Sequence, residues 1–150
     1  MSQSLAHIII HLVFSTKERK PILVKTIRDE LYAYMAEVLQ ADESPAILIN
    51  GTEDHVHVLF ILSKTHALCE VIELVKKRSS KWIKTKGKRF EKFQWQSGYG
   101  AFSVSESLID KVRQYIEDQE SHHAKISFKD EMKSLLEKHG VKYDIDHIWT

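Results

Sequence analysis

Two apolar segments rich in β-branched residues constrain the fold of this 150-residue chain more than any other feature. Residues 5–15 are LAHIIIHLVFS and residues 55–62 are HVHVLFIL. Segments of this length and composition are typical of strands that are mostly buried. A shorter strand is expected over residues 46–50, and the GTED segment that follows it is typical of a hairpin turn. The sequence therefore predicts a sheet in which the second and third strands are antiparallel neighbours.

Amphipathic helices alternate with these strands, because apolar residues recur at helical spacing in four further segments. Ser103 and Glu106 stand three residues apart and are expected to form a capping box at the start of the third helix, with Ser105 as an alternative N-cap. Ser127 is likewise expected to mark the start of the fourth helix. Residues 93–102 are expected to be a strand or an extended loop. The expected helices cover residues 22–40, 65–84, 106–123 and 128–139.

The order of these elements indicates an α+β fold. A strand, a helix, two strands, a helix, a further strand and two helices fit a ferredoxin-like or RRM-like antiparallel sheet with helices packed on it. The length fits a single domain over residues 1–150. The tail, residues 141–150, is expected either to add a strand or to lie along the surface.

Cysteine content and hydropathy exclude several classes of protein. Cys69 is the only cysteine, so no intramolecular disulfide and no cysteine-based zinc site can form, and a reducing, cytosolic setting is expected. No stretch approaches the roughly 20 apolar residues that a membrane span needs. The sequence also lacks a glycine-rich phosphate loop and a Gly-x-Ser-x-Gly elbow. Membrane, nucleotide-driven and serine-hydrolase functions are therefore not expected.

One short segment is strongly basic. Residues 76–92 contain nine Lys or Arg residues and a single acid, Glu91, although the whole chain carries a net charge of only +1. Aromatic residues, Trp82 and Phe90 among them, are interleaved with the cations. This pattern fits two interpretations equally well. One is a nucleic-acid surface, and the other is a solvated helix face followed by a polar loop. The candidate DNA-binding residues are Lys77, Lys81, Lys84, Lys88 and Arg89.

Two histidines form the first candidate site. His55 and His57 flank Val56 on a predicted strand, so both imidazoles point to the same face and can reach one metal ion. Two histidines at a solvent-facing strand edge are the alternative. His11, on the first strand, is expected to have a structural role or to contact a ligand lying on the sheet.

A tyrosine and a glutamine form the second candidate site. Tyr115 and Gln119 are four residues apart and share one face of the third predicted helix, so a phenol and an amide carbonyl can address the same centre. Packing of the tyrosine ring, with its hydroxyl in water, is the alternative. His122 and His123 follow. Because adjacent helical residues point about 100° apart, both are not expected to bind one ion while the helix continues.

Four segments together resemble a known family: HLVFSTKERKPIL, EDHVHVLF, WQSGYGAFSVSES and VRQYIEDQESHHAKISFKDE. They resemble, in order over roughly residues 5 to 140, the single-strand DNA transposases of the insertion-sequence 200/605 family, which are single-tyrosine HUH nucleases. The His-hydrophobic-His element is shared with rolling-circle initiators and relaxases. The Tyr-x-x-x-Gln element followed by His-His is more particular to this family.

The resemblance implies a role for each candidate residue. Tyr115 is the expected nucleophile, and His55, His57 and Gln119 are the expected ligands of a divalent metal, Mg²⁺ or Mn²⁺. The implied activity is cleavage and rejoining of single-stranded DNA at hairpin-bearing ends through a 5′-phosphotyrosine, without a nucleotide cofactor. The implied setting is the bacterial or archaeal cytoplasm, with nucleoid association during activity.

The resemblance also implies assembly. Members of the family are homodimers, and in many of them the tyrosine helix of one subunit completes the histidine site of the other. Other functions remain open at this point: a domesticated HUH nickase, a non-catalytic ferredoxin-like module that binds single-stranded nucleic acid, or a metal-binding structural protein. The non-catalytic module would bind nucleic acid without metal dependence.

Overall fold

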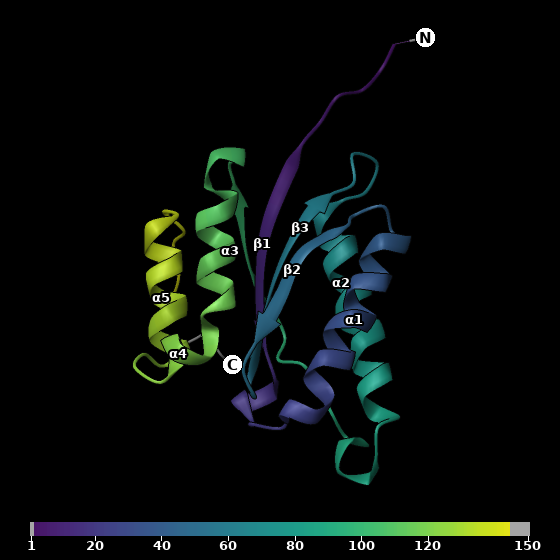
Figure 1. Cartoon of the computed structure of the whole chain (residues 1–150), viewed down its shortest axis with the longest axis vertical. Coiled ribbons are helices and arrows are strands. Elements are labelled where there is room, and N and C mark those ends of the chain that lie inside the picture. Colours follow the sequence, from purple (N-terminus) through teal and green to yellow (C-terminus); the bar gives the residue numbers. More distant parts are fainter. Residues whose placement is uncertain (1, 145–150) are drawn as a thin grey trace.

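The computed structural model describes residues 2–144. Its centre is a four-stranded sheet in the order β2-β3-β1-β4, with every neighbouring pair of strands antiparallel (Figure 1). The α+β class is confirmed, and so is the predicted hairpin between the second and third strands. The strands are β1 (Ile8–Ser15), β2 (Ala46–Gly51), β3 (His55–Leu62) and β4 (Gly100–Val104).

Helices cover both faces of this sheet (Figure 1). Helices α1 (Lys25–Ala41) and α2 (Leu68–Lys84) pack on one face, and helices α3 (Ile109–Glu117), α4 (Gln119–His123) and α5 (Phe128–Lys138) lie on the other. Within the described residues, no helix combines the length and the apolar character that a bilayer span requires. Residues 2–144 also include three short 3-10 helices: η1 (Lys17–Arg19), η2 (Lys88–Phe90) and η3 (Glu106–Leu108).

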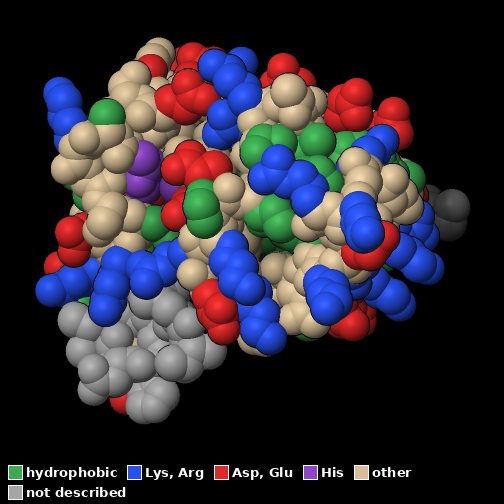
Figure 2. Space-filling view, turned by 90° about the horizontal axis from the view of Figure 1, so that it is seen from below, with side chains coloured by type: hydrophobic (Ala, Val, Ile, Leu, Met, Phe, Trp, Pro, Cys, Tyr) green, Lys and Arg blue, Asp and Glu red, His purple; other side chains and the backbone are tan. Residues whose placement is uncertain are grey.

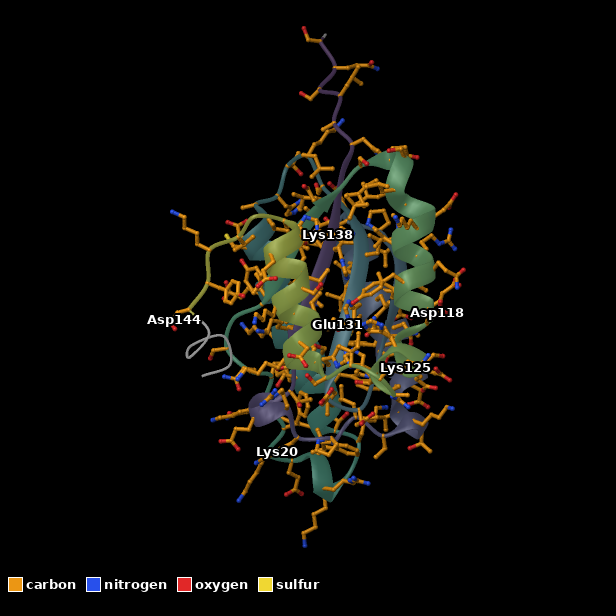
Figure 3. The ribbon with its side chains drawn as sticks, turned by 90° about the vertical axis from the view of Figure 1, so that its left-hand side faces the viewer. Lys20, Asp118, Lys125, Glu131, Lys138 and Asp144 are labelled. Atoms are coloured by element: carbon orange, nitrogen blue, oxygen red, sulfur yellow. The ribbon has the colours of Figure 1, made fainter. Side chains whose placement is uncertain are left out.

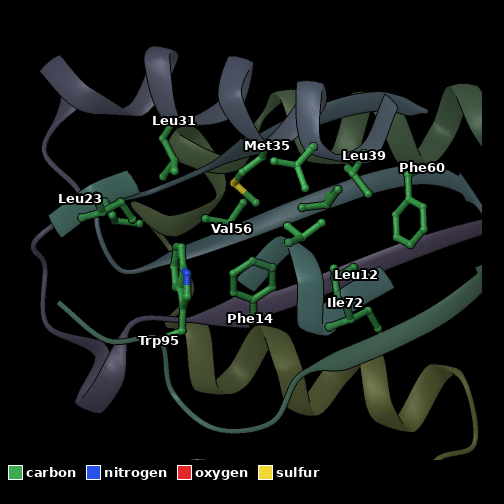
Figure 4. Packing of buried hydrophobic residues seen from close by; sticks show 14 of the residues in the cluster. Leu12, Phe14, Leu23, Leu31, Met35, Leu39, Val56, Phe60, Ile72 and Trp95 are labelled. Carbon is green, nitrogen blue, oxygen red and sulfur yellow. The ribbon is translucent and has the colours of Figure 1, made fainter. Parts of the chain in front are cut away.

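The main core lies between the sheet and helices α1 and α2 (Figure 4). Because side chains alternate along a strand, every second residue of β1 and β3 faces these helices. Trp95 closes one end of the core: its ring meets Phe14 edge-on at 4.6 Å, and its indole N–H donates to Ser79 Oγ at 3.0 Å. The strand residues in this core are Ile10, Leu12, Phe14, Val56, Val58 and Phe60.

The opposite face of the sheet carries two smaller apolar clusters. Ile9 and Leu59 pack against Ile116 of α3, whereas Val13 packs with α5. The same alternation that buries Val56 under α1 and α2 turns its two histidine neighbours toward α3, α4 and α5. The sequence therefore places polar imidazoles between two apolar patches, under helices that shield them from water.

Gly51 allows the tight hairpin that leads into β3. A Cβ at this position would lie 2.2 Å from the carbonyl oxygen of His55, a backbone atom that cannot move aside without breaking the pairing. The same carbonyl accepts a hydrogen bond from the backbone N–H of Thr52 at 3.0 Å. A glycine at this position therefore fixes how His55 enters the sheet.

The expected third helix, residues 106–123, is wrong in two respects. The helix breaks at Asp118, which separates α3 from α4. The expected capping box is also wrong, because Ser103 belongs to β4 and pairs with Ile10 of β1, while Ser105 precedes η3 without a side-chain capping bond. Pairing with β1 thus extends the chain where local sequence favoured a helix start.

The other element boundaries differ less. The predicted strand or loop over residues 93–102 is mainly loop, with Trp95 in one isolated bridge to Thr16 and regular pairing only from Gly100 onward. Ser127 is confirmed as an N-cap, since its hydroxyl accepts from the backbone N–H of Asp130 at 3.2 Å. Residues 141–144 form no strand, and the rest of the expected tail lies outside the described residues.

Replacing Phe14 with alanine is expected to lower the free energy of unfolding by about 3–5 kcal/mol, because a ring only 2% exposed would leave a cavity beside Trp95. Urea denaturation of both proteins measures the difference. Leu5→Ala is the control: Leu5 is 86% exposed, and its loss should change stability by less than about 0.5 kcal/mol. Equal effects of the two substitutions would contradict the described core.

Candidate active site

His55 and His57 are fully buried and lie side by side, with their ring centroids 5.2 Å apart. The Nδ1 atom of His55 is 2.7 Å from a carboxylate oxygen of Asp54 and 2.9 Å from the Thr52 hydroxyl. A proton on Nδ1 donated to Asp54 fixes the ring and leaves Nε2 pointing into the space under the helices. This is the usual way in which a protein orients a histidine that binds a metal.

His11 supports the second imidazole. Its Nε2 atom is 2.8 Å from Nδ1 of His57, and the two rings are stacked with centroids 5.0 Å apart. Burial, helped by the neighbouring His57, lowers the pKa of His11 to about 3, so His11 is neutral. A neutral His11 can accept the Nδ1–H of His57 when the Nε2 atom of His57, which lies 3.1 Å from Glu131 Oε1, serves as a metal ligand. His11 thus contacts the metal-binding candidate His57, which fits the expected structural role of His11.

Tyr115 and Gln119 lie opposite the histidines. The Tyr115 ring centroid is 5.8 Å from that of His57, and Gln119 Oε1 is 3.0 Å from His55 Nε2. The break at Asp118 does not separate the two residues, because Asn50 of β2 donates its side-chain amide to the carbonyls of Ile116 and Glu117 and so caps α3 where it ends. The structure therefore brings the four sequence-predicted residues together within one chain.

Sequence reasoning missed the residue at the centre of this cluster, Glu131 of α5. Its carboxylate is buried and accepts hydrogen bonds from the Tyr115 hydroxyl and from the Gln119 amide, the latter at 3.1 Å. A signal was present in the sequence: Glu131 occupies the apolar stripe of its helix, between Phe128 and Leu135. A charged residue in such a stripe needs buried partners, because burying an unpaired carboxylate costs several kcal/mol or more.

His122 and His123 both approach Glu131, but only His123 belongs to the group that could hold a metal ion, which agrees with the expectation that both would not bind one ion. Nε2 of His123 is 2.9 Å from Oε1, and Nε2 of His122 is 3.3 Å from Oε2. Their ring planes are 87° apart, and each imidazole approaches a different oxygen of the carboxylate. His123 thereby joins the site next to His55, whose ring centroid is 4.4 Å away.

The pKa values follow from burial and from the shared carboxylate. Burial alone would lower the pKa of His55, but its hydrogen bonds to Asp54 and Glu131 outweigh burial and raise that pKa to about 9. Burial keeps the pKa of His57 below its usual value. Burial opposes ionisation of Glu131, yet hydrogen bonds from the histidines hold its pKa far below the usual range. Burial, and then Glu131, raises the pKa of Tyr115.

The same atoms form a group that fits a metal ion. His55, His57, His123 and Glu131 each offer one ligand atom, and these atoms lie within 4.8 Å of one another. Glu131 Oε1 is 3.4, 3.1 and 2.9 Å from the Nε2 atoms of the three histidines. Ligands bound to one ion at about 2.0–2.2 Å are about 3 to 3.5 Å apart, so the three separations from Glu131 are close to this range. Imidazoles with one carboxylate suit Mn²⁺, Fe²⁺ or Zn²⁺ better than Mg²⁺.

A cavity of about 650 Å³ opens beside this cluster, between α3 and α5. Figure 3 looks onto α5 and labels Glu131 and Lys138 along it. The walls are largely apolar, and two lysines, one from each helix, add positive charge. The cavity thus gives a flexible chain access to the tyrosine. Its lining includes Tyr115, His122, Lys111, Leu135, Lys138 and His139.

The basic segment lies elsewhere. Its candidate residues are exposed on α2 and η2, which pack against the face of the sheet opposite the histidines. Seen from below, histidine side chains lie in a recess on one side of the molecule, and Lys and Arg side chains surround a hydrophobic patch on the other (Figure 2). The structure therefore does not bring Lys77, Lys81, Lys84, Lys88 or Arg89 to the histidine site.

The aromatic residues of the basic segment are not free to stack on bases. Phe90 is buried, as are Phe93 and Trp95 in the loop that follows. Trp82 stacks on Tyr34 with centroids 5.6 Å apart, and the ammonium of Lys86 is 4.3 Å from the Trp82 ring centroid. Phe90, Phe93 and Trp95 therefore cannot stack on bases, because they pack α2 and the loop onto the core.

Comparison with known proteins identifies the class of protein to which this fold and site belong. The model of the family described as "Transposase IS200 like" matches residues 4–119, which is more than half of the chain. The chain therefore belongs to the IS200-like transposase family, and the resemblance inferred from its motifs is confirmed.

Individual relatives agree with this membership. The ISDra2 transposase TnpA of Deinococcus radiodurans is 25% identical over 114 residues, which are 73% of this chain and 81% of the relative. A solved structure described as a transposase, from Deinococcus radiodurans R1, covers 79% of this chain and 98% of its own, with 22% identity and a TM-score of 0.62. The REP-associated tyrosine transposase bound to a REP hairpin covers 97% and 90%, with 13% identity and a TM-score of 0.56. Both solved structures share the fold.

Proposed function

We propose that this transposase-family protein cleaves and rejoins single-stranded DNA at hairpin-bearing ends, with Tyr115 as the nucleophile. One observation carries the proposal: the Tyr115 hydroxyl lies in the same buried cluster as His55, His57 and Gln119, and the cluster opens into a cavity. With a metal bound in place of the Nε2 protons, the two imidazoles and the amide oxygen would add no negative charge to the site. They can therefore hold a divalent ion that retains positive charge toward a phosphate.

The chemistry follows from these groups. The phenol gives up its proton, its oxygen forms a bond to the scissile phosphorus, and the bond from phosphorus to the 3′ oxygen breaks. The 3′ oxygen takes up a proton, which leaves a 5′-phosphotyrosine and a free 3′ hydroxyl. A bound Mg²⁺ or Mn²⁺ would supply positive charge to a non-bridging phosphate oxygen and to the leaving oxygen. One phosphoester replaces another, so rejoining needs no nucleotide cofactor. Tyr115 of α3, which contacts Glu131 and His57, supplies the attacking oxygen.

The proposed DNA partner is supported by one relative, which is bound to a REP hairpin. In this chain the exposed cations of α2 and η2 offer phosphate contacts for a hairpin stem. A stem held there and a phosphate at Tyr115 would lie on opposite faces of the sheet. The two parts of the substrate would then be joined by a strand that passes around the sheet.

A labelled single strand that carries a hairpin, incubated with the protein and Mn²⁺, tests the proposal. We expect a protein–DNA adduct that survives denaturation and electrophoresis, together with a released strand that ends in a 3′ hydroxyl. Binding of the hairpin without an adduct, unchanged by a chelator, would instead support the non-catalytic binding module. An adduct without any rejoined product would support a domesticated nickase.

Lys81→Ala combined with Lys84→Ala is expected to weaken hairpin binding at moderate salt and to make its salt dependence shallower. Each lost phosphate contact should reduce the slope of log affinity against log salt by roughly 0.7–0.9. A filter-binding titration at several salt concentrations measures both effects. The control replaces Lys25 and Lys64, which are exposed and stand outside the basic segment. The same loss in both double variants would show that total charge, rather than the α2 surface, governs binding.

A further inference from the structure

We propose that Glu131 has two roles: one carboxylate oxygen is a ligand of the metal centre, and the other positions the hydroxyl of Tyr115. This inference rests on the proposed function and deepens it, because it links the metal and the nucleophile through a single side chain. The expected ligand set contained neither Glu131 nor any other carboxylate.

The two oxygens of Glu131 face different groups. Oε1 faces the three imidazoles, at 2.9 Å from His123, 3.1 Å from His57 and 3.4 Å from His55. Oε2 accepts the hydrogen bond from the Tyr115 hydroxyl. Neither role therefore uses the atom that the other role needs.

The backbone around Glu131 is held firmly enough to keep this arrangement. Ser127 caps the helix one turn earlier, and Phe128 stacks on the His55 ring with centroids 4.3 Å apart. Met132 packs beside Val13 of β1. These contacts come from both sides of Glu131 and hold the first turns of α5 against the sheet, and Glu131 itself is only 2% exposed.

Two consequences follow from this placement. A carboxylate among imidazoles increases affinity for a divalent cation, because it adds a negative charge inside a site with little water. An acceptor for the Tyr115 hydroxyl limits the rotation of its O–H bond and holds the phenol oxygen at a fixed place beside the metal ligands. Glu131 would therefore influence both how tightly the metal binds and how well the nucleophile is placed.

Glu131→Gln, which keeps the shape and removes the charge, tests both roles. Calorimetry with Mn²⁺ should show affinity reduced by about 10–100-fold, and the visible spectrum of the Co²⁺-loaded protein should change because one ligand differs. Adduct formation should stay slow even at saturating Mn²⁺, since the orientation of the tyrosine is not restored. Glu137→Gln is the matched control, an exposed glutamate on the same helix, and should leave all three measurements unchanged.

Other outcomes would overturn the inference. Unchanged Mn²⁺ affinity and an unchanged Co²⁺ spectrum in Glu131→Gln would exclude the ligand role, and full rescue of adduct formation by excess Mn²⁺ would exclude the positioning role. If Glu131→Gln fails to fold, Glu131→Asp takes its place, because the shorter side chain keeps the charge but cannot serve both sides at once. The metal measurements do not depend on DNA, so a failure of the proposed cleavage would be seen separately, as a wild-type protein that binds metal and forms no adduct.

Discussion

Tyr115→Phe is expected to abolish the protein–DNA adduct, with a loss of roughly 10³-fold or more. The substitution removes one oxygen atom, the one that would bond to phosphorus, and keeps the ring. Its contacts with His57 and His122, at centroid distances of 5.8 and 5.3 Å, should hold the ring in place, so folding should be preserved. Denaturing electrophoresis with a labelled hairpin strand measures the adduct, and circular dichroism checks the fold.

A second tyrosine provides the control. Tyr99 is half-exposed on the loop before β4, and Tyr99→Phe should form the adduct at the wild-type rate. Mass spectrometry of the wild-type adduct should find the nucleotide on the peptide that contains residue 115. An adduct that persists in Tyr115→Phe would assign the nucleophile to a different side chain and would remove the basis of the proposed mechanism.

His57→Ala is expected to have the next largest effect, a loss of at least about 100-fold in both Mn²⁺ affinity and adduct formation. The imidazole is fully buried and contacts Glu131 and His11. Calorimetry and the adduct assay measure the two losses. His66→Ala is the control, since His66 lies near Asp42 and away from the site. A His57→Ala protein that is folded and still binds Mn²⁺ like the wild type would contradict the proposed ligand set.

Mixing the two inactive variants tests whether subunits share a site. Tyr115 and His57 of one chain are already neighbours, so a mixture of Tyr115→Phe and His57→Ala proteins should stay inactive even if the protein is the proposed homodimer. Restored adduct would mean that the tyrosine helix is exchanged between subunits. Light scattering on the wild-type protein tests the homodimer itself.

Much of the fold was predictable because its signals are local. The alternating apolar pattern of residues 55–62 and the short GTED turn before it specify a hairpin, and the same alternation places both histidines on one face. Helical periodicity located α1 and α2 to within three residues at each end. The prediction that Tyr115 and Gln119 point to the same place also agrees with the structure, since the helix break between them covers only one residue.

The remaining features depend on contacts between distant segments. The end of α3 is set by Asn50, which is 66 residues away from the first carbonyl that it caps. The position of Glu131 in the apolar stripe of its helix signals a buried partner, but the sequence alone does not show that the partners are imidazoles from β3 and α4. The aromatic residues near the basic segment fit a base-stacking pattern in the sequence, because sequence alone does not show which side of a helix the core covers.

The separation of the basic helix from the tyrosine by the thickness of the sheet has a consequence for which nucleic acid can react. Double-stranded DNA is stiff over about 50 nm, far more than the dimensions of this molecule, so a continuous duplex held on α2 could not turn back to the other side. Unpaired nucleotides bend freely and could make that turn. The architecture itself would then reject intact double helices, without any residue that recognises strandedness.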